Sequence, residues 1–182
     1  MTDPSAPRWA WALSGSGHFF TECLEIIGGL GAVDLFVSAA AEEVLRMYKQ
    51  KLPEGTGLFR DRTASAAPVG RFYEGRYHTL VVAPASSNTV AKAVLGISDT
   101  LVTNCFAQAG KCRVPAIVFA CDTAPEMLSM APGGLVKVFP RRIDLEHTEK
   151  LRTFEATTVA ESLADLEAAV ARRKAELAQT PA

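Results

Sequence analysis

The chain has 182 residues, a length that suits one domain with a sizeable hydrophobic core. Hydrophobic residues make up 48% and charged residues 21%, the usual mixture of a globular protein, which argues against extended disorder. The 19 basic and 20 acidic residues leave a net charge of −1, so no general field would attract nucleic acid or an anionic membrane surface.

No apolar run reaches the length of a membrane span, and residues 1–7 lack the basic and apolar regions of a signal peptide. These features predict a cytoplasmic protein. Four cysteines in a chain of this size point to reduced thiols rather than a disulfide framework. The spacing of Cys105, Cys112 and Cys121 matches no standard zinc site, so buried thiols are favoured over a metal or cluster site. We therefore expect no metal.

The first elements contain a candidate phosphate-binding turn. Residues 1–7 are expected to form a loose leader, residues 9–13 a strand, and residues 19–27 a helix. The turn Ser14-Gly15-Ser16-Gly17 lies between the strand and the helix, where small residues let backbone N–H groups approach a phosphate. Such a turn is half of a phosphate site, and glycine at this place also serves tight packing alone.

A second strand is expected over residues 33–37, ending at Ser38, with a helix over residues 39–51. Two parallel strands joined by a helix form a right-handed unit, which would bring Ser38 beside the first turn. Residues 53–76 are broken by proline and glycine and contain several arginines and aromatic residues. Two interpretations of that segment stay open: a lid or subunit contact, or a solvated connection.

The central stretch, residues 80–104, contains the strongest candidate site. An apolar run over residues 80–83 predicts a buried strand that stops at Pro84. Small polar residues follow where the chain turns into a helix, and a second helix is expected to begin near Asp99, capped by Ser98 or Asp99. The polar residues at this elbow are Ser86, Ser87, Asn88 and Thr89. Open α/β sheets bind ligands at such carboxyl ends of strands.

The remaining pattern completes an alternation of strands and helices. We expect a strand over residues 114–120 that ends at Cys121, and an irregular segment or short helix over residues 125–134. A strand over residues 135–139 and a helical turn over residues 144–152 follow, and residues 159–182 form a C-terminal helix and tail. The sequence therefore predicts one α/β domain spanning residues 1–182, a three-layer, doubly wound parallel sheet of the flavodoxin or Rossmann-like type.

The elbow, Pro84-Ala85-Ser86-Ser87-Asn88-Thr89, is followed by Gly96-Ile97-Ser98-Asp99-Thr100-Leu101. These two motifs resemble the flavoprotein family of homo-oligomeric flavin-containing cysteine decarboxylases and their relatives. That family carries Pro-Ala-Ser-Ala-Asn-Thr and then Gly-Ile-Ala-Asp-Asn-Leu. In this chain Ser87 replaces the usual alanine and Thr100 the usual asparagine, which are small or neutral changes.

The resemblance implies a flavodoxin-like fold, bound FMN, and a homotrimeric unit that can assemble further and holds the flavin between subunits. The turn Ser14 to Gly17 and Ser38 would hold the FMN phosphate, and the elbow would contact the flavin ring or ribityl chain. Arg113 matches an arginine that helps to bind FMN in the related prenyltransferases. The implied cofactor-binding residues are Ser14, Gly15, Ser16, Gly17, Ser38, Ser86, Ser87, Asn88, Thr89 and Arg113.

Two sequence features distinguish between the decarboxylase and reductase branches of the family. Cysteine decarboxylases carry a Pro-x-Met-Asn segment after the next strand and an upstream catalytic histidine, whereas residues 119–123 here read Phe-Ala-Cys-Asp-Thr, which disfavours decarboxylation. Residues 11–18 and 141–151 are similar to the archaeoflavoprotein branch, which includes flavin-dependent dihydromethanopterin reductases. The resemblance thus implies an FMN-dependent dihydromethanopterin reductase.

The implied reaction has two steps. An external donor, a nicotinamide or ferredoxin-like molecule, reduces the flavin, which then delivers hydride to the C=N bond of a bound dihydropterin. His18 is a candidate proton donor, although a histidine at a helix start is also a common polar neighbour of the cap. Cys121 is a second candidate, which would tune the flavin or simply pack.

Two other functions stay open. The first is prenyl transfer onto flavin, because related prenyltransferases share the small-residue turn and the Gly-Ile-Ser-Asp run. These enzymes normally carry a lysine-containing segment where this chain has Asn88 and Thr89, which counts against that reading. The second is an FMN electron carrier partnered with a ferredoxin.

Overall fold

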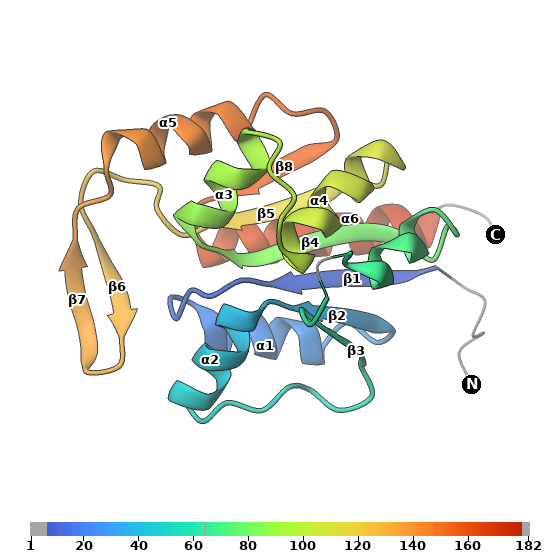
Figure 1. Cartoon of the computed structure of the whole chain (residues 1–182), viewed down its shortest axis with the longest axis horizontal. Coiled ribbons are helices and arrows are strands. Elements are labelled where there is room, and N and C mark those ends of the chain that lie inside the picture. The colour runs from blue at the N-terminus through green and yellow to red at the C-terminus, as the bar shows by residue number, and fades with distance from the viewer. Residues whose placement is uncertain (1–6, 64, 180–182) are drawn as a thin grey trace.

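The computed structural model describes residues 7–63 and 65–179, and within them six parallel strands form one twisted sheet (Figure 1). The strand order is β3-β2-β1-β4-β5-β8. The strands are β1 (Arg8–Leu13), β2 (Val33–Val37), β3 (Gly57–Arg60), β4 (Tyr77–Ala85), β5 (Ala116–Ala120) and β8 (Thr157–Ala160). The predicted doubly wound α/β fold is confirmed.

Helices cover both faces of the sheet. They are α1 (Phe20–Gly28), α2 (Ala39–Met47), α3 (Ser87–Val94), α4 (Leu101–Lys111), α5 (Arg142–Leu151) and α6 (Leu163–Gln179), with a 3-10 helix, η1, over Ala67–Phe72. Alternate residues of β1 point to opposite faces, so Trp11 packs with α1, α2 and α6 while Ala12 packs with α3, α4 and η1. The result is three layers with a buried core on each side of the sheet.

The chain reverses its direction across the sheet between β1 and β4. From β1 the strands proceed outward through β2 to β3, and from β4 they proceed the other way through β5 to β8. The loops that leave β1 and β4 therefore diverge toward opposite faces. In open α/β sheets this topological switch point, at the carboxyl ends of the strands, is where ligands bind.

The segment over residues 53–76, expected to lack regular elements, contains β3 and η1. Strand β3 has four residues, none of them fully buried, so its sequence carries no strong strand pattern. Phe72 of η1 is buried and packs near Phe36 and Tyr77. Part of this segment therefore covers the sheet instead of forming a solvated connection.

Two boundaries near the elbow differ from expectation. Strand β4 does not stop at Pro84 but runs to Ala85, because the ladder with β5 shifts register between Val82 and Ala85 and so accommodates a residue without an N–H. Helix α4 is capped by Thr100 rather than by Ser98 or Asp99. The Thr100 hydroxyl accepts from the Thr103 N–H. Ser98 and Asp99 lie too many residues before Thr103 to make this capping bond.

Residues 125–134, expected to be irregular or helical, instead begin an antiparallel hairpin of β6 (Met127–Ala131) and β7 (Gly134–Val138). The hairpin projects from the body of the molecule at one end (Figure 1). Strand β8 was not predicted: the C-terminal helix was expected to begin at Val159, whereas residues 157–160 form a strand and the helix begins at Leu163. Four-residue strands leave too little periodicity to separate them from a helix start.

No helix within the described ranges is long and apolar enough to cross a membrane. All four cysteines are free thiols. The predicted leader, apart from Pro7, and the last three residues of the predicted tail lie outside the described residues.

Candidate functional site

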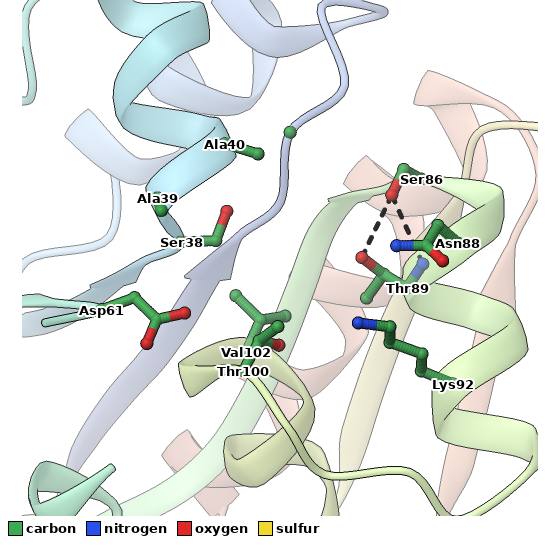
Figure 2. A pocket seen from close by; sticks show the side chains of 11 residues that line it. Ser38, Ala39, Ala40, Asp61, Ser86, Asn88, Thr89, Lys92, Thr100 and Val102 are labelled. Carbon is green, nitrogen blue, oxygen red and sulfur yellow. Dashed lines mark hydrogen bonds between the residues drawn. The ribbon is translucent and has the colours of Figure 1, made fainter. Parts of the chain in front are cut away.

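A cavity of about 460 Å³ lies at the carboxyl ends of four neighbouring strands. In the order of the sheet, Asp61 follows β3, Ser38 follows β2, Gly15 follows β1, and Ser86 follows β4. The cavity is lined by Gly15, Ser38, Ala39, Ala40, Asp61, Ser86, Asn88, Thr89, Lys92, Thr100 and Val102 (Figure 2). It therefore opens at the switch point of the fold.

One wall is formed by the turn after β1 and the N-terminus of α2. The Ser38 hydroxyl accepts a hydrogen bond from the Ala41 N–H at 3.0 Å, capping the helix. The N–H groups of Ala39 and Ala40 have no partner among the described residues. A Cβ on Gly15 would come within 2.4 Å of the Ala40 Cβ. Glycine thus permits the turn to lie against the helix start, where free N–H groups and the helix dipole favour an anion.

The opposite wall is formed by the elbow and helix α3. The Ser86 hydroxyl caps α3 by accepting from the Thr89 N–H at 3.4 Å, and the two side-chain hydroxyls lie 3.1 Å apart. Figure 2 shows Ser86, Asn88, Thr89 and Lys92 on the side of the cavity that faces Ser38 and Ala40. Hydroxyl, amide and ammonium groups from a second helix N-terminus thus face the first.

Ser14 does not line the cavity but joins its two walls. Its buried hydroxyl donates to the Pro84 carbonyl at 2.8 Å and accepts from the Ser86 N–H at 2.9 Å. The only proton that a serine hydroxyl can donate is therefore already used inside the protein. Ser14, predicted to hold a phosphate, instead fixes the turn after β1 to the elbow after β4.

Asp61, Lys92, Thr100 and Val102 line the cavity although the sequence analysis assigned them no role. Thr100 lies in the quoted motif Gly96–Leu101, and Lys92 lies in the helix that follows the elbow; these two positions were the available signal. Asp61 carried no signal, because it follows β3, the strand that the sequence did not reveal. Its carboxylate points toward the cavity in Figure 2.

His18 lies behind the turn rather than on the cavity wall. It is buried, and its Nδ1 accepts from the Met130 N–H at 3.4 Å, which ties the turn to the hairpin. Burial lowers the pKa of His18, against the opposing effect of Asp122 and Glu22. The lowered pKa favours the neutral form of His18, and its ring ties the turn to the hairpin instead of facing the cavity.

Cys121 is also buried beside the turn, where its thiol donates to the Ser16 hydroxyl at 3.2 Å. The Cys121 N–H donates to the Ala85 carbonyl at 3.0 Å, which places the residue next to the elbow as predicted. Burial raises the pKa of Cys121 to about 12, so the thiol is protonated at neutral pH and is no nucleophile.

Ser16, Gly17, Ser87 and Arg113 do not line the cavity. The first two belong to the turn, where Gly17 is packed against the Tyr48 ring, and Ser87 is the first residue of α3. Arg113 is exposed and lies just before β5, at the amino end of the strands. Within one chain Arg113 therefore lies at the opposite edge of the sheet from the cavity, and its contact with FMN stays a prediction.

The residues that meet at the cavity fit a phosphorylated cofactor such as FMN. The volume is in the range of small-molecule sites, and two helix N-termini supply unpaired N–H groups and small hydroxyl side chains. The close approach of Gly15 to Ala40 leaves the backbone accessible to a phosphate. Asn88 and Thr89 offer donors and acceptors to a polar ring edge.

Comparisons with known proteins point to the same kind of site. The Flavoprotein family model matches residues 2–180. A dihydromethanopterin reductase (acceptor) of Methanosarcina mazei is 42% identical over 144 residues, a match that covers 70% of this chain and only 60% of that protein. An uncharacterised protein of Methanocaldococcus jannaschii is 35% identical over 169 residues and is covered over 91% of its length.

A solved structure is similar over nearly the whole length of both chains. Burkholderia xenovorans DmrB in complex with FMN, described as a cubic protein cage for redox transfer, is 48% identical with a TM-score of 0.87. The match covers 97% of this chain and 99% of that one. Fold and sequence thus agree with a protein whose crystal contains the cofactor that the cavity fits.

Proposed function

The chain belongs to the flavoprotein family, and on this basis we propose that it binds FMN in the cavity and acts as an FMN-dependent reductase of a dihydropterin. The observation that carries the proposal is the meeting of two helix N-termini at the switch point of the sheet. A glycine turn that touches one of these helices completes the arrangement.

The two walls of the cavity suit the two ends of FMN. The Ala39 and Ala40 N–H groups and the Ser38 hydroxyl hold the phosphate, since backbone N–H groups at a helix start are the strongest anion donors on this wall. Ser86, Asn88 and Thr89 hold the ring or the ribityl chain from the other wall. Ser14 positions both walls through its two hydrogen bonds.

Bound FMN would supply two-electron redox chemistry: reduced by an external donor, it would give hydride to the C=N carbon of the dihydropterin, while the nitrogen takes a proton from solvent. The chain's own residues bind and orient the cofactor and leave one side of the cavity open to a second molecule. The pterin is proposed as substrate because the Methanosarcina relative, 42% identical, is a dihydromethanopterin reductase. The cysteine beside the site stays protonated and serves as packing for the turn.

We also propose that the protein is a homo-oligomer built from trimers. Apolar side chains are exposed between α3 and α4 and on the hairpin, where Leu95 is 63% and Leu135 62% exposed. Exposed apolar surface of this kind marks interaction sites. The cage formed by Burkholderia DmrB supports assembly of similar chains.

The function is tested by a stoichiometric reduction without turnover. The purified full-length protein is loaded with FMN, desalted, reduced anaerobically with one equivalent of dithionite, and mixed with dihydromethanopterin. We expect the yellow colour of oxidised flavin to return with formation of one equivalent of the tetrahydro product. A reduced protein that stays colourless in the presence of the dihydropterin would contradict the proposed substrate.

Two further additions distinguish the alternative functions. Consumption of dimethylallyl phosphate by the reduced protein would favour prenyl transfer. Re-oxidation by oxidised ferredoxin without any reaction with the dihydropterin would favour an electron carrier. A protein that retains no FMN after desalting would overturn the cofactor assignment itself.

A further inference from the structure

The hairpin of β6 and β7 stands apart from the main sheet. Within the described ranges its two strands pair only with each other, and the hairpin projects from one end of the molecule (Figure 1). An isolated two-stranded hairpin is marginally stable in water, so contacts with the rest of the protein must fix its position. Those contacts decide where its exposed apolar side chains, such as Leu128 and Leu135, are presented.

Met130 of β6 is held by two side chains from the body of the molecule. Its N–H donates to His18 Nδ1 at 3.4 Å, and its carbonyl accepts from the Tyr48 hydroxyl at 3.4 Å. In an antiparallel pair, successive residues direct their main-chain groups alternately toward the partner strand and away from it. Both polar groups of Met130 therefore face the body rather than β7. Both bonds are longer than typical hydrogen bonds, so each is weak.

The same two side chains also contact the turn after β1. The His18 N–H donates to the Ser16 hydroxyl at 3.3 Å, and a Cβ on Gly17 would come within 2.5 Å of the Tyr48 hydroxyl oxygen. Tyr48 is also the C-cap of α2, the helix whose N-terminus lines the cavity. A displacement of the turn or of α2 therefore shifts the groups that hold Met130.

The bond between Met130 and His18 requires a neutral imidazole. Nδ1 can accept only while it carries no proton, which puts the single ring proton on Nε2. Burial lowers the pKa of His18 and favours this form, whereas the acidic groups that face it, Glu22 of α1 and Asp122 after β5, oppose the shift. The groups that α2 and β6 bring to this contact are the Tyr48 hydroxyl and the Met130 main chain. A proton taken up from solvent at Nδ1 would point two N–H groups at each other and break the bond.

We propose that His18 and Tyr48 latch the hairpin to the turn after β1, so that FMN bound at the turn stabilises the docked hairpin and protonation of His18 releases it. This inference rests on the proposed FMN site and adds two positioning residues that lie outside the cavity. Coupling between two sites is reciprocal, so a docked hairpin in turn favours FMN binding. The position of an apolar hairpin thus depends on whether the cofactor is in place.

The test measures hydrogen exchange of the hairpin amides by mass spectrometry in the full-length protein, with and without FMN, at about pH 7.5 and about pH 5. Rates are divided by the intrinsic rates at each pH, and the amides of β1 serve as the reference for global unfolding. His18→Gln keeps an accepting oxygen but cannot titrate, His18→Phe keeps a ring without an acceptor, and Tyr48→Phe removes only the hydroxyl. The matched control is His147→Gln in α5, at a histidine whose Nδ1 has no hydrogen-bond partner within the described residues.

We expect hairpin protection in the wild type to fall about threefold to tenfold between the higher and the lower pH, as one hydrogen bond is lost. His18→Gln should keep its protection at both pH values, and His18→Phe should be poorly protected at both. Tyr48→Phe should begin with lower protection and still lose more in acid. His147→Gln should behave as the wild type does.

FMN should raise hairpin protection about fivefold in the wild type at the higher pH and should have little effect in His18→Phe. An equal loss of protection in acid in His18→Gln and the wild type would overturn the inference, as would a hairpin whose exchange rate does not respond to bound FMN. Failure of the wild-type protein to retain FMN would instead overturn the proposed function. The pH comparison of the apoproteins would then still decide whether His18 holds the hairpin.

Discussion

Ser14 and Ser86 are joined by a hydrogen bond in which the Ser86 N–H donates to the Ser14 hydroxyl at 2.9 Å. The same hydroxyl donates to the Pro84 carbonyl at 2.8 Å. One buried side chain thus connects the turn after β1 to the elbow after β4, the two loops that diverge at the switch point. Gly15 and Ser86, the neighbours of these bonded groups, both line the cavity.

Ser14→Ala should therefore affect both stability and cofactor binding. Removal of the hydroxyl leaves the Pro84 carbonyl and the Ser86 N–H without their partner, which should lower the free energy of unfolding by about 1–3 kcal/mol. Urea denaturation of the apoprotein measures this loss, and titration with FMN should show weaker binding. Thr153→Ala is the control, because the Thr153 hydroxyl is exposed and bonds only within its own turn. An equal loss of unfolding free energy in Ser14→Ala and Thr153→Ala would argue against a special role of Ser14.

Gly15→Ala tests the close approach of the turn to α2. The new Cβ would come within 2.4 Å of the Ala40 Cβ, so the turn or the helix must move. Overpacking of this kind costs about 1–3 kcal/mol, and if that cost falls on the bound state the Kd for FMN should rise about tenfold or more.

Gly28→Ala is the matched control for this change. Gly28 is the last residue of α1, and nothing lies within 4 Å of its added Cβ. Binding of FMN by fluorescence quenching measures both variants. Unchanged affinity in Gly15→Ala would show that the phosphate does not lie against this turn.

The sequence was informative where strands are fully buried and end in small polar residues. Strand β2 was predicted with its observed bounds, and the expected position of Ser38 beside the first turn is confirmed by its N–H donating to the Leu13 carbonyl at 3.1 Å. A buried parallel strand reads as a continuous apolar run, which leaves little freedom in its assignment. The resemblance to the flavoprotein family is confirmed by the match to the Flavoprotein model, while the contact of the elbow residues with FMN stays a prediction.

The sequence failed where an element is short or where spatial direction matters. Strand β3 has four residues, none of them fully buried, so Asp61 was not recognised as the residue at its carboxyl end. Arg113 could not be placed without knowing that it comes before β5, at the edge of the sheet remote from the cavity. The role of Ser14 also escaped, because a hydroxyl whose proton is taken by Pro84 has the same sequence pattern as one that faces a phosphate.

Asn88→Asp should weaken cofactor retention. Asn88 lines the cavity from α3, and its amide N–H₂ can donate to an acceptor on the flavin ring, whereas a carboxylate can only accept and adds a negative charge. Loss of one hydrogen bond corresponds to about 0.5–1.5 kcal/mol, so the Kd for FMN should rise by about threefold to tenfold. Equilibrium dialysis with FMN measures the change. Gln179→Glu, the same amide-to-carboxylate change at an exposed residue of α6 outside the cavity, should retain wild-type occupancy; unchanged occupancy in Asn88→Asp would remove Asn88 from the ring contacts.

His78 should make the folded protein sensitive to acid. Burial, helped by the nearby Arg173, lowers the pKa of His78 from 6.5 to about 4. Between these two values the unfolded chain binds a proton that the folded chain does not, so stability falls as the pH drops from 6.5 toward 4 and is unaffected by this group above 6.5. His78→Gln should flatten this part of the pH dependence. Urea midpoints measured across the same range test it, with His147→Gln as the control for loss of an imidazole elsewhere. If the urea midpoint of His78→Gln falls with pH as steeply as that of the wild type, other groups cause the acid sensitivity. His18 is the first of these to examine, because burial also lowers its pKa.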